Sequence, residues 1–170
     1  GTIDLLESVN GDVRAAGGEI TIGDRVGGDV VVAGGSVHLL SGSNVSGDVI
    51  VMGGRVVLDG VILGGVRVLG GQVVINGLVS GSVSAKVSES LTVNTGASVK
   101  GDLEYTAPAE ADISSGALVS GTITFTQSGR VGKADFEAVL ASIAGLFFFV
   151  KFLALLIASV LVVLLVRRLA

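Results

Sequence analysis

Residues 28–37 have the sequence GDVVVAGGSV, in which a Gly-Asp step, an alternating aliphatic run and a glycine pair follow one another. The Gly-Asp step returns along the chain, first unchanged and then in looser form. Its copies begin at Gly11, Gly28, Gly47, Gly64, Gly81, Gly101 and Gly121, at intervals of 17, 19, 17, 17, 20 and 20 residues. Intervals of this length are typical of a coil wound repeatedly about one axis, and they are too short for a helix pair or a propeller blade. The repeat therefore predicts a solenoid.

The copies share one internal pattern, which is complete in the first four. The Gly-Asp step leads into a first alternating run, a glycine pair follows, and a second alternating run such as Ile20-Thr21-Ile22 completes the unit. A single aliphatic residue precedes the next Gly-Asp step by two positions. Because side chains alternate across a strand, the first and third residues of each run point to one face. That face is predicted to be the core.

Stacking the copies predicts four inward columns of aliphatic side chains. They contain Val13, Val30, Val49, Val66, Val83, Leu103 and Ile123; Ile20, Val37, Val56, Val73, Leu91 and Ile113; Ile22, Leu39, Leu58, Ile75 and Val93; and Val9, Val26, Val45, Ile62, Val79, Val99 and Val119. Three short strands separated by glycine corners would close each coil, with the next coil hydrogen-bonded to it in parallel at about 4.8 Å. Glycine is expected at the corners because it reaches positive φ without a Cβ penalty.

The fold class predicted from these columns is all-β, a parallel β-helix of about six to seven coils. Its hand follows from two arguments. Left-handed coils built from hexapeptides require a repeat divisible by six, which intervals of 17, 19 and 20 residues do not satisfy. Parallel connections also favour the right-handed crossover. We therefore predict a right-handed parallel β-helix.

The amino-terminal residues belong to the same repeat. Ile3 and Leu5 lie 17 positions before Ile20 and Ile22, so the sequence begins in the middle of a coil. It also begins without methionine, which we expect of a processed or trimmed segment. A terminal coil leaves apolar surface and strand edges without a neighbour. The amino-terminal end is therefore a predicted association surface.

A different kind of sequence follows the repeats. Residues 127–134 are polar and contain glycine, which is typical of a linker between a β-helix in residues 1–126 and a helix in residues 135–170. Residues 143–166 contain one charged residue, Lys151, among 24. About 20 apolar residues suffice to cross a bilayer as a helix. We predict a membrane-anchoring helix with a transmembrane span over 143–166.

The charged residues of this segment bear on how it would sit in the membrane. The Lys151 side chain is expected to snorkel to the headgroups beside residues 147–149. Two other interpretations remain, namely that Lys151 faces a partner helix within the membrane, and that an interfacial helix up to Val150 precedes a short crossing from Phe152. The arginine pair at 167–168 closes the span. The positive-inside rule then places the carboxyl end in the cytoplasm and the β-helix outside.

Composition and motifs exclude several function classes. The formal net charge of −4 argues against nucleic acid as a partner, since a basic stripe would be expected. The glycine patterns match neither a dinucleotide fingerprint, nor a phosphate loop, nor calcium-binding nonapeptides. The chain has no cysteine and a single histidine, His38, which lies between two predicted inward residues and so points outward. Neither a catalytic triad nor a zinc site is expected. We predict that the protein is not an enzyme and has no catalytic, cofactor-binding or metal-binding residues.

A column of carboxylates has two interpretations. Asp12, Asp29 and Asp48 occupy equivalent positions and would stack from coil to coil. Stacked carboxylates would suit a hard cation such as calcium, whereas aspartate beside glycine commonly accepts backbone hydrogen bonds at a corner. Because Gly65 and Ser82 interrupt the column, we expect the second role.

Two aromatic residues enter an inward column near its end. Tyr105 and Phe125 occupy the positions that hold Ala15, Val32 and Val68 in earlier copies. Larger side chains at these positions predict a widened, plugged end of the solenoid close to the membrane. Stacking against a ligand is the less favoured interpretation, because both side chains lie on the inward side of their strands.

Two segments carry a resemblance to a known family. Residues 28–37 and residues 96–106, GASVKGDLEYT, resemble the bactofilin-like, polymer-forming β-helix proteins of bacteria, especially their membrane-anchored relatives. The likeness covers roughly residues 9–126. Bactofilins are cytoskeletal scaffolds that polymerise end to end without nucleotide, so the resemblance implies a structural role. The apolar carboxyl-terminal segment departs from the cytoplasmic members of the family.

The predicted function is that of a membrane-anchored structural scaffold in a bacterial envelope. Its expected partners are the lipid bilayer and other copies of the chain, through the β-helix ends. One alternative is an extracytoplasmic binding module, an adhesin or glycan receptor that uses the outward columns. Another is a sensor or accessory domain of a larger membrane protein.

Overall fold

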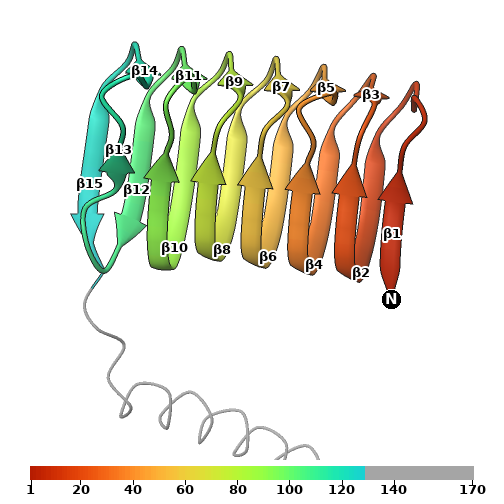
Figure 1. Ribbon diagram of the computed structural model, residues 1–170, viewed down its shortest axis with the longest axis horizontal. Coiled ribbons are helices and arrows are strands. Elements are labelled where there is room, and N and C mark those ends of the chain that lie inside the picture. Colours follow the sequence, from red (N-terminus) through yellow and green to blue (C-terminus); the bar gives the residue numbers. More distant parts are fainter. Residues whose placement is uncertain (129–170) are drawn as a thin grey trace, which may run out of the picture. The chain divides into compact units, whose positions relative to one another are not determined.

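The computed structural model describes residues 1–128, which form an all-β parallel solenoid of about seven coils (Figure 1). These residues fall within one compact unit, Gly1–Gly129. Among residues 1–128 there is no helix that could cross a membrane. Most of the predicted linker, the helix in 135–170, the span over 143–166 and Lys151 lie outside the described residues.

Five coils each contribute one long strand, and most coils add one short strand. The long strands are β2 (Val13–Ile22), β4 (Val30–Leu39), β6 (Val49–Leu58), β8 (Val66–Ile75) and β10 (Val83–Val93). The short strands are β3 (Arg25–Val26), β5 (Asn44–Val45), β7 (Val61–Ile62), β9 (Leu78–Val79), β11 (Ser98–Val99) and β14 (Leu118–Val119). The terminal coils contain β1 (Thr2–Leu5), β12 (Leu103–Ala107), β13 (Asp112–Ile113) and β15 (Ile123–Gln127).

The strands form two sheets in which every pair is parallel. The larger sheet has the order β1-β2-β4-β6-β8-β10-β12-β15, with β13 also paired to β10, and the smaller one has the order β14-β11-β9-β7-β5-β3. The register follows the repeat, because Ile3 pairs with Ile20 and Val13 pairs with Val30. The parallel solenoid predicted from the sequence is therefore confirmed in residues 1–128.

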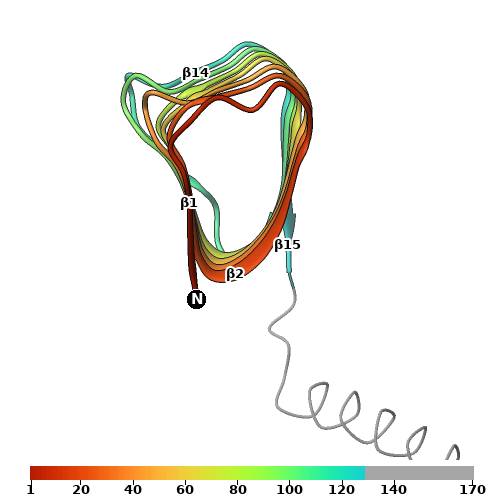
Figure 2. The same ribbon diagram turned by 90° about the vertical axis from the view of Figure 1, so that its right-hand side faces the viewer.

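The path of one coil differs from the prediction at the glycine pair. Three strands separated by corners were expected, but the first corner lies inside a single ten-residue strand. Gly17 pairs with Gly34 and Gly34 with Gly53, so the ladder continues through the bend. Viewed along the axis in Figure 2, the long strand curves around one corner and the short strand closes the remaining face.

The predicted role of the glycines at the corners is wrong. Among the described residues only Gly96 has a positive φ, of 90°. Several of the glycines, Gly71 and Gly81 among them, are required instead by the closeness of the neighbouring coil. A Cβ on Gly71 would lie 2.6 Å from the carbonyl oxygen of Gly54, and one on Gly81 would lie 2.7 Å from that of Gly64. Side chains are therefore excluded by stacked backbone rather than by backbone dihedrals.

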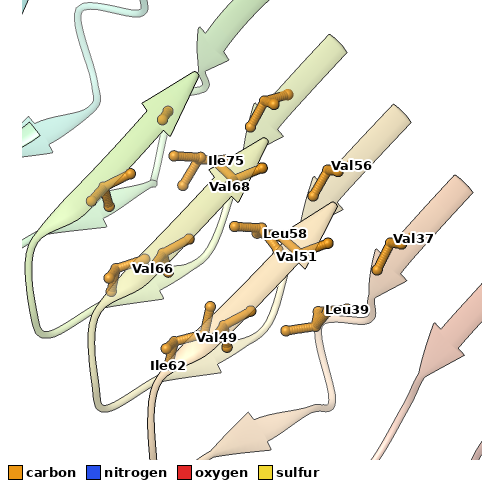
Figure 3. Close-up of a cluster of buried hydrophobic side chains, with 14 of the residues drawn as sticks. Val37, Leu39, Val49, Val51, Val56, Leu58, Ile62, Val66, Val68 and Ile75 are labelled. Carbon is orange, nitrogen blue, oxygen red and sulfur yellow. The ribbon is translucent and has the colours of Figure 1, made fainter. Parts of the chain in front are cut away.

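The four predicted columns lie in the core, together with the column that contains Val32, Val51 and Val68 (Figure 3). Val30, Val37, Leu39 and Val45 are fully buried, one from each column. Burial falls away only in the terminal coils, where Ile123 is 46% exposed. The prediction of which residues face inward is confirmed for the middle of the solenoid. The side chains are fully buried there because a neighbouring coil covers each column on both sides.

One column assignment is wrong. Ile113 was expected beside Leu91, but it pairs with Val93 and so belongs to the column that begins with Leu5 and Ile22. Ala111, two residues earlier, packs against the core at the position expected for Ile113. The cause is the coil that follows Ala107, in which β12 ends early and a short loop replaces the second half of the long strand.

Candidate functional site

The aspartate column links successive coils through backbone hydrogen bonds. Asp12 Oδ1 accepts the N–H of Asp29 at 3.0 Å, and Asp29 Oδ1 accepts the N–H of Asp48 at 2.8 Å. Asp48 Oδ1 accepts the N–H of Gly65 at 2.8 Å. This is the backbone role expected for these residues rather than the cation site. Within residues 1–128, no group of three or more His, Asp or Glu side chains is arranged to hold a metal ion.

The same ladder resumes further along the solenoid. Ser82 Oγ accepts the N–H of Asp102 at 3.2 Å, and Asp102 Oδ1 accepts the N–H of Thr122 at 2.8 Å. Each side chain therefore satisfies the amide at the same position of the next coil. Gly65 has no side chain, so the ladder is interrupted between Asp48 and Ser82.

A second polar column, which the sequence analysis missed, follows the long strands. Asn94 Nδ2 donates to Asn76 Oδ1 at 2.7 Å, and Asn76 Nδ2 donates to Asp59 Oδ1. His38 Nε2 lies 2.5 Å from Asp59 Oδ2. His38 points outward as predicted, with 39% of its side chain exposed, but it is engaged by Asp59. The signal in the sequence is that Asp59, Asn76 and Asn94 each directly follow the last residue of a long strand.

Burial and hydrogen bonding act in opposite directions on Asp59. Partial burial alone would raise the pKa of its carboxyl group, because a charge is less well solvated there. Hydrogen bonds from His38 and Asn76, together with the charge of His38, favour the ionised form, and the pKa of Asp59 is lowered overall. The polar column is therefore built around an ionised carboxylate.

This shift predicts how the stability of the solenoid depends on pH. A carboxyl group whose pKa is lowered on folding stabilises the fold above its unfolded value of about 3.9, and that contribution disappears as the pH falls through the folded pKa. The difference in unfolding free energy between the wild type and Asp59→Asn is expected to shrink as the pH falls below about pH 4. Urea denaturation at a series of pH values measures this difference. A difference that stays constant down to acid pH would show that Asp59 is not the linked group.

The two aromatic side chains stack at the carboxyl-terminal end of the described solenoid. Tyr105 is buried, and its ring lies against that of Phe125 with centroids 5.1 Å apart and an interplanar angle of 27°. The Tyr105 hydroxyl accepts the N–H of Ala111 at 3.0 Å, which anchors the loop that replaces the missing strand segment. The inward placement is confirmed for Tyr105. Phe125 is partly buried, and no further coil of residues 1–128 covers it. The two rings stack on each other, which leaves no space for a ligand between them.

The amino-terminal end presents a free strand edge and apolar surface. β1 pairs only with β2, so its other edge has no partner among the described residues. The carbonyl oxygen of Leu5 accepts the N–H of Gly23 in the next coil. Because residues of a parallel strand alternate in the side to which they bond, Thr2 and Asp4 direct their amides to the free edge. Ile3, Leu5 and Val9 are only partly buried.

The other end is complementary in its arrangement. β15 pairs only with β12, and it lies on the half of the coil that corresponds to the start of a long strand. β1 corresponds instead to the second half of a long strand, since it pairs with Glu19–Ile22 of β2. The described solenoid thus carries one half coil at each end, and the two halves are different (Figure 1).

Comparison with known proteins returned no match. No family model matches the chain, and none of the curated proteins or solved structures matches it.

Proposed function

We propose that the protein is a structural scaffold, similar to a bactofilin, whose solenoids associate end to end and are tethered to a bacterial membrane by the apolar segment at 143–166. The observation that carries the proposal is the pair of unlike half coils at the two ends of residues 1–128. Among the described residues, β1 and β15 each have one partner strand, so both leave backbone amides, carbonyl groups and aliphatic side chains uncovered at an edge. We also propose that the solenoid lies outside the cytoplasm and that its coil is right-handed.

Stacking one copy on another would complete a coil from two chains. β15 of the first copy would supply the opening half of that coil, and β1 of the second copy would supply the closing half. Every inward column would continue across the junction, because Val13 would follow Ile123 at the next step of its column. The contact joins two unlike surfaces and does not close on itself, so it generates a filament rather than a dimer.

Cysteine pairs test this junction directly, because the chain has no cysteine of its own. Arg14 and Thr124 belong to one outward column and would become neighbours across the junction, about 4.8 Å apart. A disulfide requires Cα atoms roughly 4.4–6.8 Å apart. The double variant Arg14→Cys/Thr124→Cys is expected to form a ladder of disulfide-linked species under mild oxidation. Non-reducing gel electrophoresis of the full chain measures it, and each single variant should stop at the dimer.

A matched double variant shows whether the ladder reports position. Val31→Cys/Ser84→Cys places two cysteines in the same outward column, at exposed positions away from the ends. A comparable ladder from this control would show random collision, and the proposal would then fail. It would equally fail if the Arg14/Thr124 pair gave no species beyond a dimer.

A proline at the free edge gives an independent test. Asp4→Pro removes an amide that points away from β2, so the fold of one copy is retained while addition of the next copy loses a hydrogen bond and meets the proline ring. Asp4→Asn keeps the amide and removes only the charge. Electron microscopy at rising concentration is expected to show elongation of the wild type and of Asp4→Asn, and short particles for Asp4→Pro. Strictly monomeric wild-type particles would contradict end-to-end association.

A further inference from the structure

The interruption of the aspartate ladder at Gly65 leaves one amide without an acceptor among residues 1–128. The corresponding amides of Asp29, Asp48, Gly65, Asp102 and Thr122 each donate to a side chain of the preceding coil. The amide of Ser82 would need a side chain at Gly65 and makes no hydrogen bond to another described residue. An oxygen atom supplied from outside the chain would therefore complete the ladder at this position.

The missing side chain also leaves a surface pocket of about 210 Å³. It lies where the corners lead into β8 and β10. The residues that line it are Asp48, Gly65, Val66, Arg67, Gly81, Ser82 and Ser84. Because the other described coils between Asp12 and Thr122 carry Asp or Ser at the position of Gly65, this arrangement is specific to one place along the rod.

The groups around the pocket include both donors and acceptors. Arg67 is exposed and has no ion-pair partner within residues 1–128, so its guanidinium group is available as a donor. Asp48 uses Oδ1 for the amide of Gly65, and Oδ2 makes no hydrogen bond to a described residue. The hydroxyl groups of Ser82 and Ser84 can each donate and accept. The amide of Ser82 adds a donor that is fixed in the backbone.

This combination favours a neutral, polyhydroxylated ligand over an ion. An anion would meet the carboxylate of Asp48, and a cation would meet the guanidinium group of Arg67. A sugar hydroxyl, in contrast, donates to a carboxylate and accepts from an amide or guanidinium at the same time. Ile50 is paired with Arg67 in register and is 37% exposed, which places an apolar surface beside the polar groups for the C–H face of a ring. A few converging polar groups with apolar surface beside them are typical of small-molecule sites.

We propose that the pocket at Gly65 is a saccharide-binding site on the side of the solenoid. The ligand would place one hydroxyl oxygen against the amide of Ser82, in the position that an aspartate carboxylate occupies in neighbouring coils. Asp48 Oδ2 would accept from an adjacent hydroxyl and Arg67 would donate to a third. This site does not depend on the ends of the solenoid, so it is independent of end-to-end association.

Nuclear magnetic resonance of the full chain tests the site, with a detergent that carries no sugar headgroup. The probes are D-glucose and N-acetyl-D-glucosamine, with inorganic phosphate and ammonium as charged comparisons. A saccharide is expected to shift the amide resonances of Ser82 and Ser84 in a saturable way, with a dissociation constant on the order of 1 mM, as suits a shallow site. Phosphate and ammonium should leave them unchanged.

Two variants and a matched control decide the outcome. Gly65→Asp supplies a carboxylate that can accept the Ser82 N–H, as Asp48 accepts that of Gly65 and Asp102 that of Thr122. This variant should abolish the shifts caused by the saccharide. Arg67→Ala leaves the backbone unchanged and should weaken binding about tenfold, whereas Arg55→Ala, an exposed arginine on another outward column, should not. The proposal is overturned if no saccharide shifts the Ser82 amide, if phosphate shifts it instead, or if Arg67→Ala and Arg55→Ala bind equally.

Discussion

Replacing Leu58 with alanine is expected to lower the free energy of unfolding by about 2–5 kcal/mol. Leu58 is 1% exposed and lies in the middle of the rod, between Leu39 and Ile75 of the same column. Removing its branched end loses the transfer free energy of the buried atoms. It also leaves a cavity that the neighbouring coils cannot close, because their backbones are hydrogen-bonded on both sides. Chemical denaturation monitored by far-UV circular dichroism measures the loss.

The control for this prediction is another leucine of the repeat. Leu63 is 50% exposed and points away from the core. The same substitution there should change stability by no more than about 0.5 kcal/mol. Equal losses at the two positions would contradict the prediction, because they would mean that burial in the inward columns does not stabilise the solenoid.

Replacing Gly81 with alanine is expected to destabilise the solenoid by about 1–3 kcal/mol through overpacking alone. A Cβ at this position would lie 2.7 Å from the carbonyl oxygen of Gly64 and 2.7 Å from the amide nitrogen of Gly65, both in the preceding coil. Both contacts are with backbone, and the Gly81 amide itself donates to the Gly64 carbonyl oxygen at 2.9 Å. The two coils must move apart to accept one methyl group, which weakens the ladder on either side. Thermal and chemical denaturation measure the effect.

Gly11 provides a control at the same place in the motif. It opens the first Gly-Asp step, and no atom lies within 4 Å of a Cβ built on it. Gly11→Ala is therefore expected to be neutral or to stabilise by about 0.4–1 kcal/mol, because alanine restricts the unfolded chain. Since both glycines share the motif and lack positive φ, only the neighbouring coil distinguishes them. Destabilisation of similar size at Gly11 would show that backbone conformation, not stacking, selects glycine.

The repeat made the interior of the protein predictable. Alternation places every second residue of a run inside, and equal intervals place equivalent residues above one another, so Ile20, Val37 and Val56 were assigned to one column correctly. Tyr105 was assigned inward for the same reason. The assignment of Ile113 was wrong, because the loop after Ala107 breaks the pattern on which the counting relied.

Polar interactions between coils were less accessible to the same reasoning. The aspartate column was visible because its members share a motif, and its backbone role followed from local chemistry. The contact between His38 and Asp59 was missed, because these residues occupy different columns and meet only when the corner brings them together. The pocket at Gly65 was missed as well, since a gap in a column becomes a cavity only between coils that are fixed on both sides.

Period-two alternation and a near-constant interval were enough to predict the coil, its register and its core, because they leave one way to bury the aliphatic residues. The steric role of glycine at the corners, the shift of Ile113 after Ala107 and the polar contacts across coils emerge only from the folded chain. The difference between the two sets of features lies in the distances on which they depend. Burial patterns are encoded along each strand. Steric exclusion and hydrogen bonding between coils depend instead on distances between residues 17 to 21 positions apart, and a change of a few tenths of an ångström in such a distance matters.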